Sequence, residues 1–79
     1  MKIRAEYTDT YAGEANYSWV RRVELDLPDT LSDLAVVRRV KKALGLEGSR
    51  AQRRENYGDS LALWGLDGCT TVLFINWEN

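Results

Sequence analysis

Hydrophobic and polar residues alternate strictly at the start of the chain, which predicts a β-strand over residues 2–8. Ile3 and Tyr7 share one side of this segment, as expected of a half-buried strand. A second alternating run predicts another strand over residues 17–27. The residues between the two runs, 9–16, are small and polar and include a glycine, so we expect a hairpin with a long loop.

The second run contains a break in its alternation. Trp19, Arg21 and Val23 share one parity, whereas the apolar Val20 falls on the other. Either a β-bulge shifts the phase near residues 20–22, or the outer half of this strand is exposed. The pattern leaves both interpretations open.

A helix is predicted over residues 31–44, after Pro28 ends the second strand. We expect Thr30 to be the N-cap, with Asp33 in the position of a weaker capping box, and Gly45 to adopt the left-handed conformation just after the helix. Apolar residues recur at spacings of three and four and form one stripe for burial: Leu31, Leu34, Val37, Val40 and Leu44.

Two further strands are predicted over residues 60–64 and 70–77, on either side of Asp67-Gly68. This dipeptide readily adopts the positive φ angles of a type I′ turn, so we expect a hairpin. The last strand is apolar on both sides, which favours a central strand or a second face that meets a partner. Residues 51–57 are polar and arginine-rich, and they suit a loop or an edge strand.

The order strand, strand, helix, strand, strand predicts the fold class. We expect an α+β two-layer sandwich in which one helix covers one face of a four-stranded, mainly antiparallel sheet. The 79 residues are too few for a second domain, so residues 1–79 are expected to form a single one. A two-layer arrangement leaves the second face of the sheet uncovered.

The composition removes most catalytic and metal-binding chemistry. The chain has no histidine and a single cysteine, Cys69, so a histidine-dependent nucleophile and a multi-ligand zinc site are both excluded. Glu24 and Asp26 share one side of a strand and are expected to be solvated. We therefore predict that the chain is not an enzyme and has no cofactor or metal ion.

Charge is segregated along the chain, although the formal net charge is only −1. Residues 38–54 carry seven basic side chains and one acidic side chain, whereas residues 55–79 carry four acidic side chains and no basic one. Such a segment is either a solvated surface, in which the loop arginines pair with Glu47 and Glu55, or a surface that binds phosphates or carboxylates. The candidate binding residues are Arg38, Arg39, Lys42, Arg50, Arg53 and Arg54.

Three aromatic residues are candidate contact residues. Tyr11 falls in the predicted long loop, and the parities of Trp19 and Trp64 suggest that at least one tryptophan lies outside the helix-covered core. Tyrosine, tryptophan and arginine are enriched at interface hot spots, which favours a binding role. The alternative is that these rings fill a small core.

A resemblance in style covers the two predicted hairpins, in the strings YTDTYAGEANYSWVRR and ENYGDSLALW, the second followed by CTTVLFINW. These strings resemble short reading frames of bacterial viruses and mobile elements, among which anti-CRISPR inhibitors are a prominent class. The resemblance implies a small non-enzymatic protein that binds a host nucleic-acid-processing or defence complex. Many members of that class are strongly acidic, so the near-zero charge here favours a mixed-charge contact with protein over mimicry of nucleic acid.

We therefore predict a phage- or mobile-element-encoded inhibitor that evades host defence by binding a host protein or ribonucleoprotein complex. Two alternatives remain: a small regulator that binds nucleic acid directly through the basic segment, and a structural homodimer. The first residues are charged and alternating instead of apolar, and the longest apolar run near the end is far short of the roughly 18 to 20 residues of a membrane span. A cytoplasmic location in a bacterial host, without membrane contact, is expected.

Overall fold

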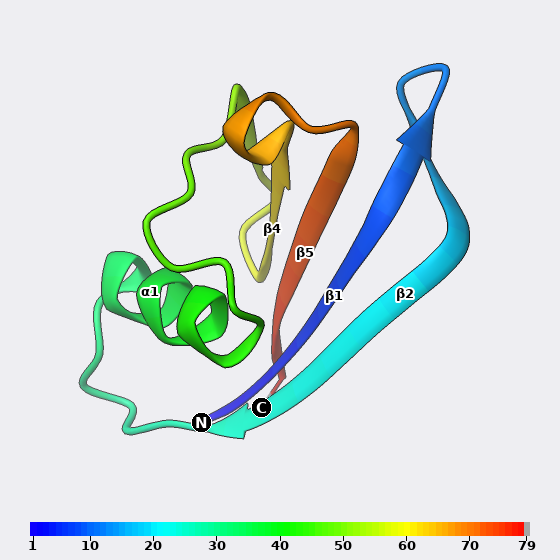
Figure 1. Cartoon of the computed structure of the whole chain (residues 1–79). Coiled ribbons are helices and arrows are strands. Elements are labelled where there is room, and N and C mark those ends of the chain that lie inside the picture. Colours follow the sequence, from blue (N-terminus) through cyan, green and yellow to red (C-terminus); the bar gives the residue numbers. More distant parts are fainter. Residues whose placement is uncertain (79) are drawn as a thin grey trace.

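Five antiparallel strands form one sheet in the computed structural model, which describes residues 1–78 (Figure 1). Their order across the sheet is β2-β1-β5-β4-β3. The strands are β1 (Lys2–Tyr11), β2 (Glu14–Asp26), β3 (Arg53–Asn56), β4 (Ser60–Trp64) and β5 (Thr71–Glu78). The prediction of an α+β domain with one helix is confirmed, but the predicted number of four strands is one too few.

The additional strand, β3, lies within residues 51–57, for which the sequence pattern left open a loop or an edge strand. Its residues pair with β4, from Arg53 opposite Trp64 to Asn56 opposite Leu61. An edge strand with an exposed face needs few apolar side chains, which is why hydrophobic patterning did not reveal it.

The helix α1 (Asp33–Ala43) begins after Ser32, whose hydroxyl accepts a hydrogen bond from the amide of Ala35 at 3.2 Å. The expected N-cap, Thr30, is therefore wrong, because the chain becomes helical two positions later than the sequence pattern indicates. Gly45 has φ of 73°, which confirms its left-handed conformation at the end of the helix. Among residues 1–78, no helix is long and apolar enough to cross a bilayer.

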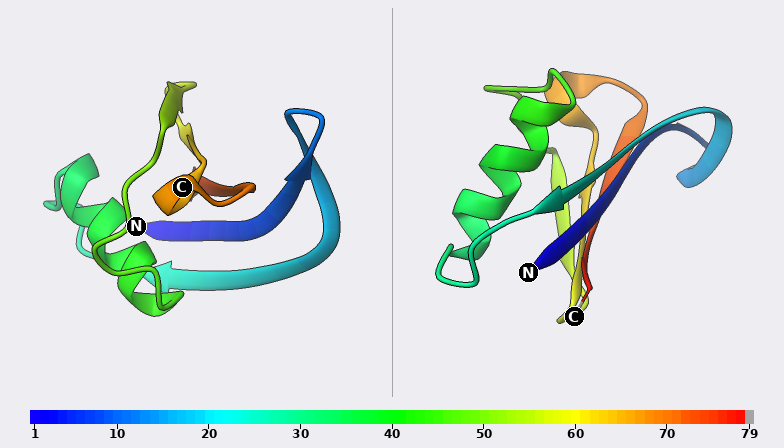
Figure 2. Two further views of the ribbon diagram at one scale, coloured as in Figure 1. Left: turned by 45° about the horizontal axis from the view of Figure 1, so that its top comes forward. Right: turned by 90° about the horizontal axis from the view of Figure 1, so that it is seen from below.

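Figure 2 shows the helix on one face of the sheet, and α1 is the only α-helix of residues 1–78. Buried side chains of α1 meet the aligned apolar side chains of the three central strands in one core. The principal members of this core are Ile3, Val36, Val40, Leu61, Leu73 and Ile75. Leu34 belongs to the predicted apolar stripe, but its side chain is 53% exposed.

The long loop predicted in the first hairpin is wrong. β1 and β2 are joined by a two-residue turn, Ala12 and Gly13, with φ of 53° and 82°. Positive φ at both positions is the geometry of a type I′ turn. The polar residues on either side of this turn are part of the strands, because backbone hydrogen bonds between strands form without apolar side chains. Tyr11 pairs with Glu14 at the end of the hairpin.

The interrupted alternation of β2 has two sources. The register shifts between the pairs Thr8–Val20 and Thr10–Ala15, so a bulge is present, but it lies before residues 20–22. Arg21 remains opposite Tyr7 on the helix side and is exposed, as the second interpretation requires.

β5 is the middle strand of the sheet, which confirms the first of the two interpretations of its apolar character. Leu73 and Ile75 face the helix, whereas Val72 and Phe74 lie on the opposite face. The hairpin of β4 and β5 is also confirmed. Its connection contains a short 3₁₀ turn, η1 (Leu66–Gly68), and is longer than the two-residue turn that the dipeptide favours.

Candidate functional site

A groove lies between α1 and the loop that follows it. It has a volume of about 560 Å³ and brings together four of the six basic residues that the sequence singled out, with one further lysine and one acidic residue. The charged lining residues are Arg38, Arg39, Lys41, Lys42, Arg50 and Glu47. We call this the basic groove.

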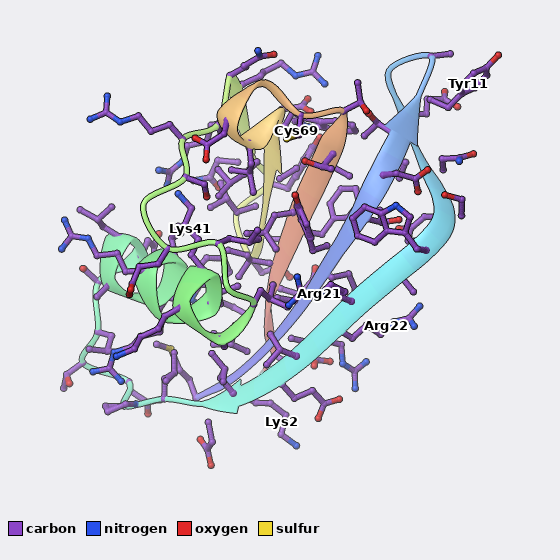
Figure 3. All side chains as sticks on the ribbon, in the orientation of Figure 1. Lys2, Tyr11, Arg21, Arg22, Lys41 and Cys69 are labelled. Carbon is purple, nitrogen blue, oxygen red and sulfur yellow. The ribbon has the colours of Figure 1, made fainter. Side chains whose placement is uncertain are left out.

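The last turn of α1 fixes one wall of the basic groove. The amides of Gly45 and Leu46 donate to the carbonyls of Lys42 and Lys41 at 3.2 and 2.7 Å, the paired hydrogen bonds of a Schellman motif. The Lys41 ammonium then donates to the carbonyl of Ser49 at 2.7 Å, so this cation holds the loop against the helix. Figure 3 shows Lys41 between the helix and the loop.

The far end of the loop is held by η1. The amide of Arg50 donates to the carboxylate of Asp67 at 3.0 Å, and the amide of Asp67 donates to the carbonyl of Arg50 at 2.8 Å. These reciprocal bonds fix the backbone of Arg50, while its side chain remains exposed at the groove. The sequence separates Arg50 from Arg39 by eleven positions, and the anchored loop returns it to the same surface.

The cations of the basic groove are not neutralised by ion pairs within the part of the chain that is described. The salt bridges of residues 1–78 involve Arg4, Arg22, Arg53 and the N-terminal amine. The predicted pairing of a loop arginine with Glu55 is found for Arg53, at 3.5 Å. The predicted pairing with Glu47 is not found in residues 1–78.

The basic groove also has an apolar component. Leu34 and Val37 line it beside the charged side chains, and Leu34 is one of the most exposed large hydrophobic residues. A surface that combines guanidinium groups with an exposed leucine suits a ligand that carries both negative charge and apolar groups.

Arg53 lies on the opposite face of the sheet, away from the basic groove. Its guanidinium carbon is 4.8 Å from the ring centroid of Trp64, a cation–π contact. Trp64 in turn packs edge-on against Phe74, with ring centroids 6.0 Å apart. Arg54 is exposed on the edge strand β3, opposite Leu63, and does not line the groove.

The three candidate aromatic residues lie in three separate places. Tyr11 is 76% exposed at the tip of the first hairpin (Figure 3). Trp19 is 41% exposed and packs edge-on against Tyr7, with centroids 5.4 Å apart. Trp64 lies on the face without the helix, which agrees with its parity.

A second hollow, on the face without the helix, contains aromatic residues that sequence reasoning missed. It has a volume of about 350 Å³ and is lined by Tyr17, Tyr57 and Phe74, with polar side chains between them. We call it the aromatic hollow. Regular alternation places Tyr17 on the same side as Trp19, and only the bulge brings it to the opposite face, so no sequence signal identified it.

The bulge that carries Tyr17 is held by Asp9. Its carboxylate accepts hydrogen bonds from the side-chain amide of Asn16 at 2.8 Å and from the hydroxyl and amide of Ser18 at 2.5 and 3.0 Å. These donors, Asn16 first, lower the pKa of Asp9 to about 2. Thr8 is fully buried and donates to the carbonyl of Trp19, which satisfies a backbone group beside the bulge.

The remaining candidate chemical groups are dispersed. Cys69 is exposed in the connection before β5 (Figure 3), and no three metal-ligating side chains gather anywhere in residues 1–78. Glu24 pairs with Arg4 at 3.1 Å, and Asp26 lies 3.7 Å from the N-terminal amine. The prediction that the chain is not an enzyme stays a prediction.

Comparison of the chain with protein-family models, with curated proteins and with solved structures gives no match.

Proposed function

We propose that this protein acts by binding and not by catalysis, and that its basic groove binds an acidic segment of a partner protein. The observation that carries this proposal is the gathering of Arg38, Arg39, Lys42 and Arg50 in one groove without a salt bridge to any described carboxylate. Unpaired guanidinium groups form bidentate hydrogen bonds with carboxylates.

The exposed Leu34 favours a protein segment over nucleic acid as the ligand. A phosphate backbone offers no apolar surface against which Leu34 could be buried, whereas an acidic peptide with apolar residues can bury its side chain. The formal net charge of −1 adds to this preference, because nucleic-acid-binding domains are generally basic overall. That the partner is a host nucleic-acid-processing or defence complex, and that the chain is phage-encoded, remain parts of this proposal.

The test is direct binding of a fluorescent peptide in which glutamates flank a central leucine, compared with a fluorescent 20-base-pair DNA duplex of mixed sequence. We expect the peptide to bind more tightly than the duplex at physiological salt. The double charge reversal Arg38→Glu/Arg39→Glu is expected to abolish peptide binding, and Leu34→Ser to weaken it.

The matched control is the double change Arg21→Glu/Arg54→Glu, which alters net charge equally at two exposed arginines that do not line the groove and take part in none of the salt bridges of residues 1–78. We expect it to leave binding intact, with circular dichroism confirming the fold of both variants. Equal loss of binding in the control would show a general charge effect and contradict the proposal. Preferential binding of the duplex, with an affinity that falls steeply with salt, would favour the nucleic-acid regulator instead.

A second candidate is the homodimer, which the free edge of β2 favours. Arg22 and Glu24 lie on the same face of this edge strand. A two-fold axis at Val23 would place Arg22 of each copy beside Glu24 of the other and extend the sheet. Light scattering that gives about 18 kDa, twice the 9.0 kDa of the chain, supports this candidate, and the monomer mass at high concentration excludes it.

A further inference from the structure

The aromatic hollow is an open site on the face of the sheet without the helix. Phe74 from β5 contributes to its lining, with Tyr17 from β2 and Tyr57 from the turn after β3. The two tyrosines are 49% and 60% exposed, so their rings are available for contact. Glu6 and Asn76 add polar groups to the lining.

A further hollow adjoins the aromatic hollow and adds to this region one carboxylate, Asp59, that has no salt bridge among the described residues. It has a volume of about 340 Å³, shares Glu6 and Asn76 with the aromatic hollow, and adds Asp59 and Glu78. Glu78 is paired with Arg4 at 3.3 Å and Glu6 is paired with Arg22 at 3.0 Å, so two of the three carboxylates are already engaged by arginines. Asp59 takes part in none of the salt bridges of residues 1–78.

The same face already binds a guanidinium group of the chain itself. Arg53 lies over Trp64, and Trp64 packs against Phe74, which lines the hollow. The neighbouring rings of Tyr17 and Tyr57 have no such contact with a cation in residues 1–78. The aromatic surface is thus suited to a guanidinium group and is only partly occupied.

Hydrogen bonds hold the backbone at both tyrosines. Tyr17 has φ of 56°, a left-handed conformation that bulky residues rarely adopt, and Asp9 maintains the bulge around it through three hydrogen bonds. Tyr57 is fixed in its turn by a hydrogen bond from its amide to the carbonyl of Ser60 at 2.9 Å. A site whose backbone is already fixed loses less entropy on binding.

We infer that the aromatic hollow binds an arginine side chain from a basic segment of a partner protein. The guanidinium plane stacks on the tyrosine rings, and its N–H groups face the carboxylate of Asp59 in the adjoining hollow. Arginine fits better than lysine because its planar group stacks on an aromatic ring and forms two parallel hydrogen bonds with a carboxylate.

This site lies on the opposite side of the sheet from the basic groove and does not depend on the proposed function. The groove takes carboxylates and the hollow takes a cation, so one experiment can fail while the other succeeds. The reversal Arg38→Glu/Arg39→Glu serves to separate them, because it removes the basic groove and leaves every residue of the hollow unchanged.

The test uses ¹H–¹⁵N NMR titration of the full chain with the peptide acetyl-Gly-Gly-Arg-Gly-Gly-amide. We expect the shifts of Tyr17, Tyr57, Asp59 and Asn76 to change together with one dissociation constant. The matched probe replaces arginine by citrulline, which keeps the shape and removes the charge, and we expect no binding. A lysine peptide is expected to bind more weakly than the arginine peptide.

Tyr57→Ala and Asp59→Asn are each expected to weaken binding roughly two- to fivefold, the range for loss of one exposed cation–π contact or ion pair. Tyr11→Ala removes an exposed tyrosine outside the hollow and is expected to change nothing. The inference is overturned if the arginine peptide causes no shifts at millimolar concentration, if citrulline binds equally well, or if the shifts map to α1. It is also overturned if folded Tyr57→Ala binds as tightly as the unaltered chain.

Discussion

Asp9 is a half-buried carboxylate that holds the bulge of β2 at one end of the sheet. Its carboxylate accepts hydrogen bonds from the amide of Ser18, which the bulge removes from the β1–β2 ladder, and from the side chains of Asn16 and Ser18. Asp9→Ala is expected to loosen the bulge and to speed hydrogen exchange at the amide of Ser18, while amides of β5 remain protected. Unchanged exchange at Ser18 would mean that the turn at Ala12 and Gly13 holds the bulge without Asp9.

The same carboxylate gives the hairpin a pH dependence. Its pKa in the folded chain is about 2, below the ordinary value of 3.8, so its ionised form stabilises the fold. This contribution is complete above about pH 4 and is lost as the pH falls through about 2. Thermal unfolding should therefore show that the unaltered chain is more stable than Asp9→Asn above about pH 4, and that this difference in stability disappears as the pH falls through about 2. A constant difference between the two would contradict this role.

Leu73 and Leu34 differ in burial, so their substitution is expected to change the stability of the fold by different amounts. Leu73 is fully buried in the middle strand, so Leu73→Ala is expected to cost about 2 to 5 kcal/mol of unfolding free energy. A domain of this size has only about 3 to 5 kcal/mol in total, so this variant should be largely unfolded. Leu34 is 53% exposed, and Leu34→Ala is expected to change stability by less than about 0.5 kcal/mol. Chemical denaturation monitored by tryptophan fluorescence measures both.

At the scale of the element, the beginning of α1 offers a clean comparison of two neighbouring hydroxyls. Ser32 caps the helix through the amide of Ala35, whereas Thr30 makes no capping hydrogen bond among those of the described residues. Ser32→Ala is expected to lower the unfolding free energy by about 1 kcal/mol, and Thr30→Ala to leave it nearly unchanged. Urea denaturation of the two variants checks this, and equal effects would contradict the assignment of the cap.

For the whole molecule, the sheet separates two surfaces of opposite character. The basic groove is lined by five cations and one carboxylate, whereas the two adjoining hollows on the other face are lined by three carboxylates and one arginine. If both sites function as proposed, the glutamate peptide and the arginine peptide will bind to one molecule at the same time. NMR titration with one peptide in the presence of the other tests this, and competition between them would show a shared site.

Several features of the fold were predictable from local pattern. The spacing of Val37 and Val40 indicated the helix, the doubly apolar β5 indicated a central strand, and Gly45 indicated where the helix ends. In each of these cases the residue type itself carries the information, because burial needs apolar side chains and a left-handed backbone favours glycine. The clustering of Arg38, Arg39 and Lys42 followed from their positions on one helix end.

Other features depended on contacts between distant residues. β3 is polar and forms because β4 is present beside it, and Arg50 joins the basic groove because Asp67 and Lys41 anchor its loop. Tyr17 changes faces at a bulge in which Ser18 donates hydrogen bonds to Asp9 on the neighbouring strand. The amino-acid sequence by itself determined which segments bury apolar side chains. Only the tertiary structure decided which polar and aromatic side chains share a surface, because that depends on strand pairing and loop anchoring.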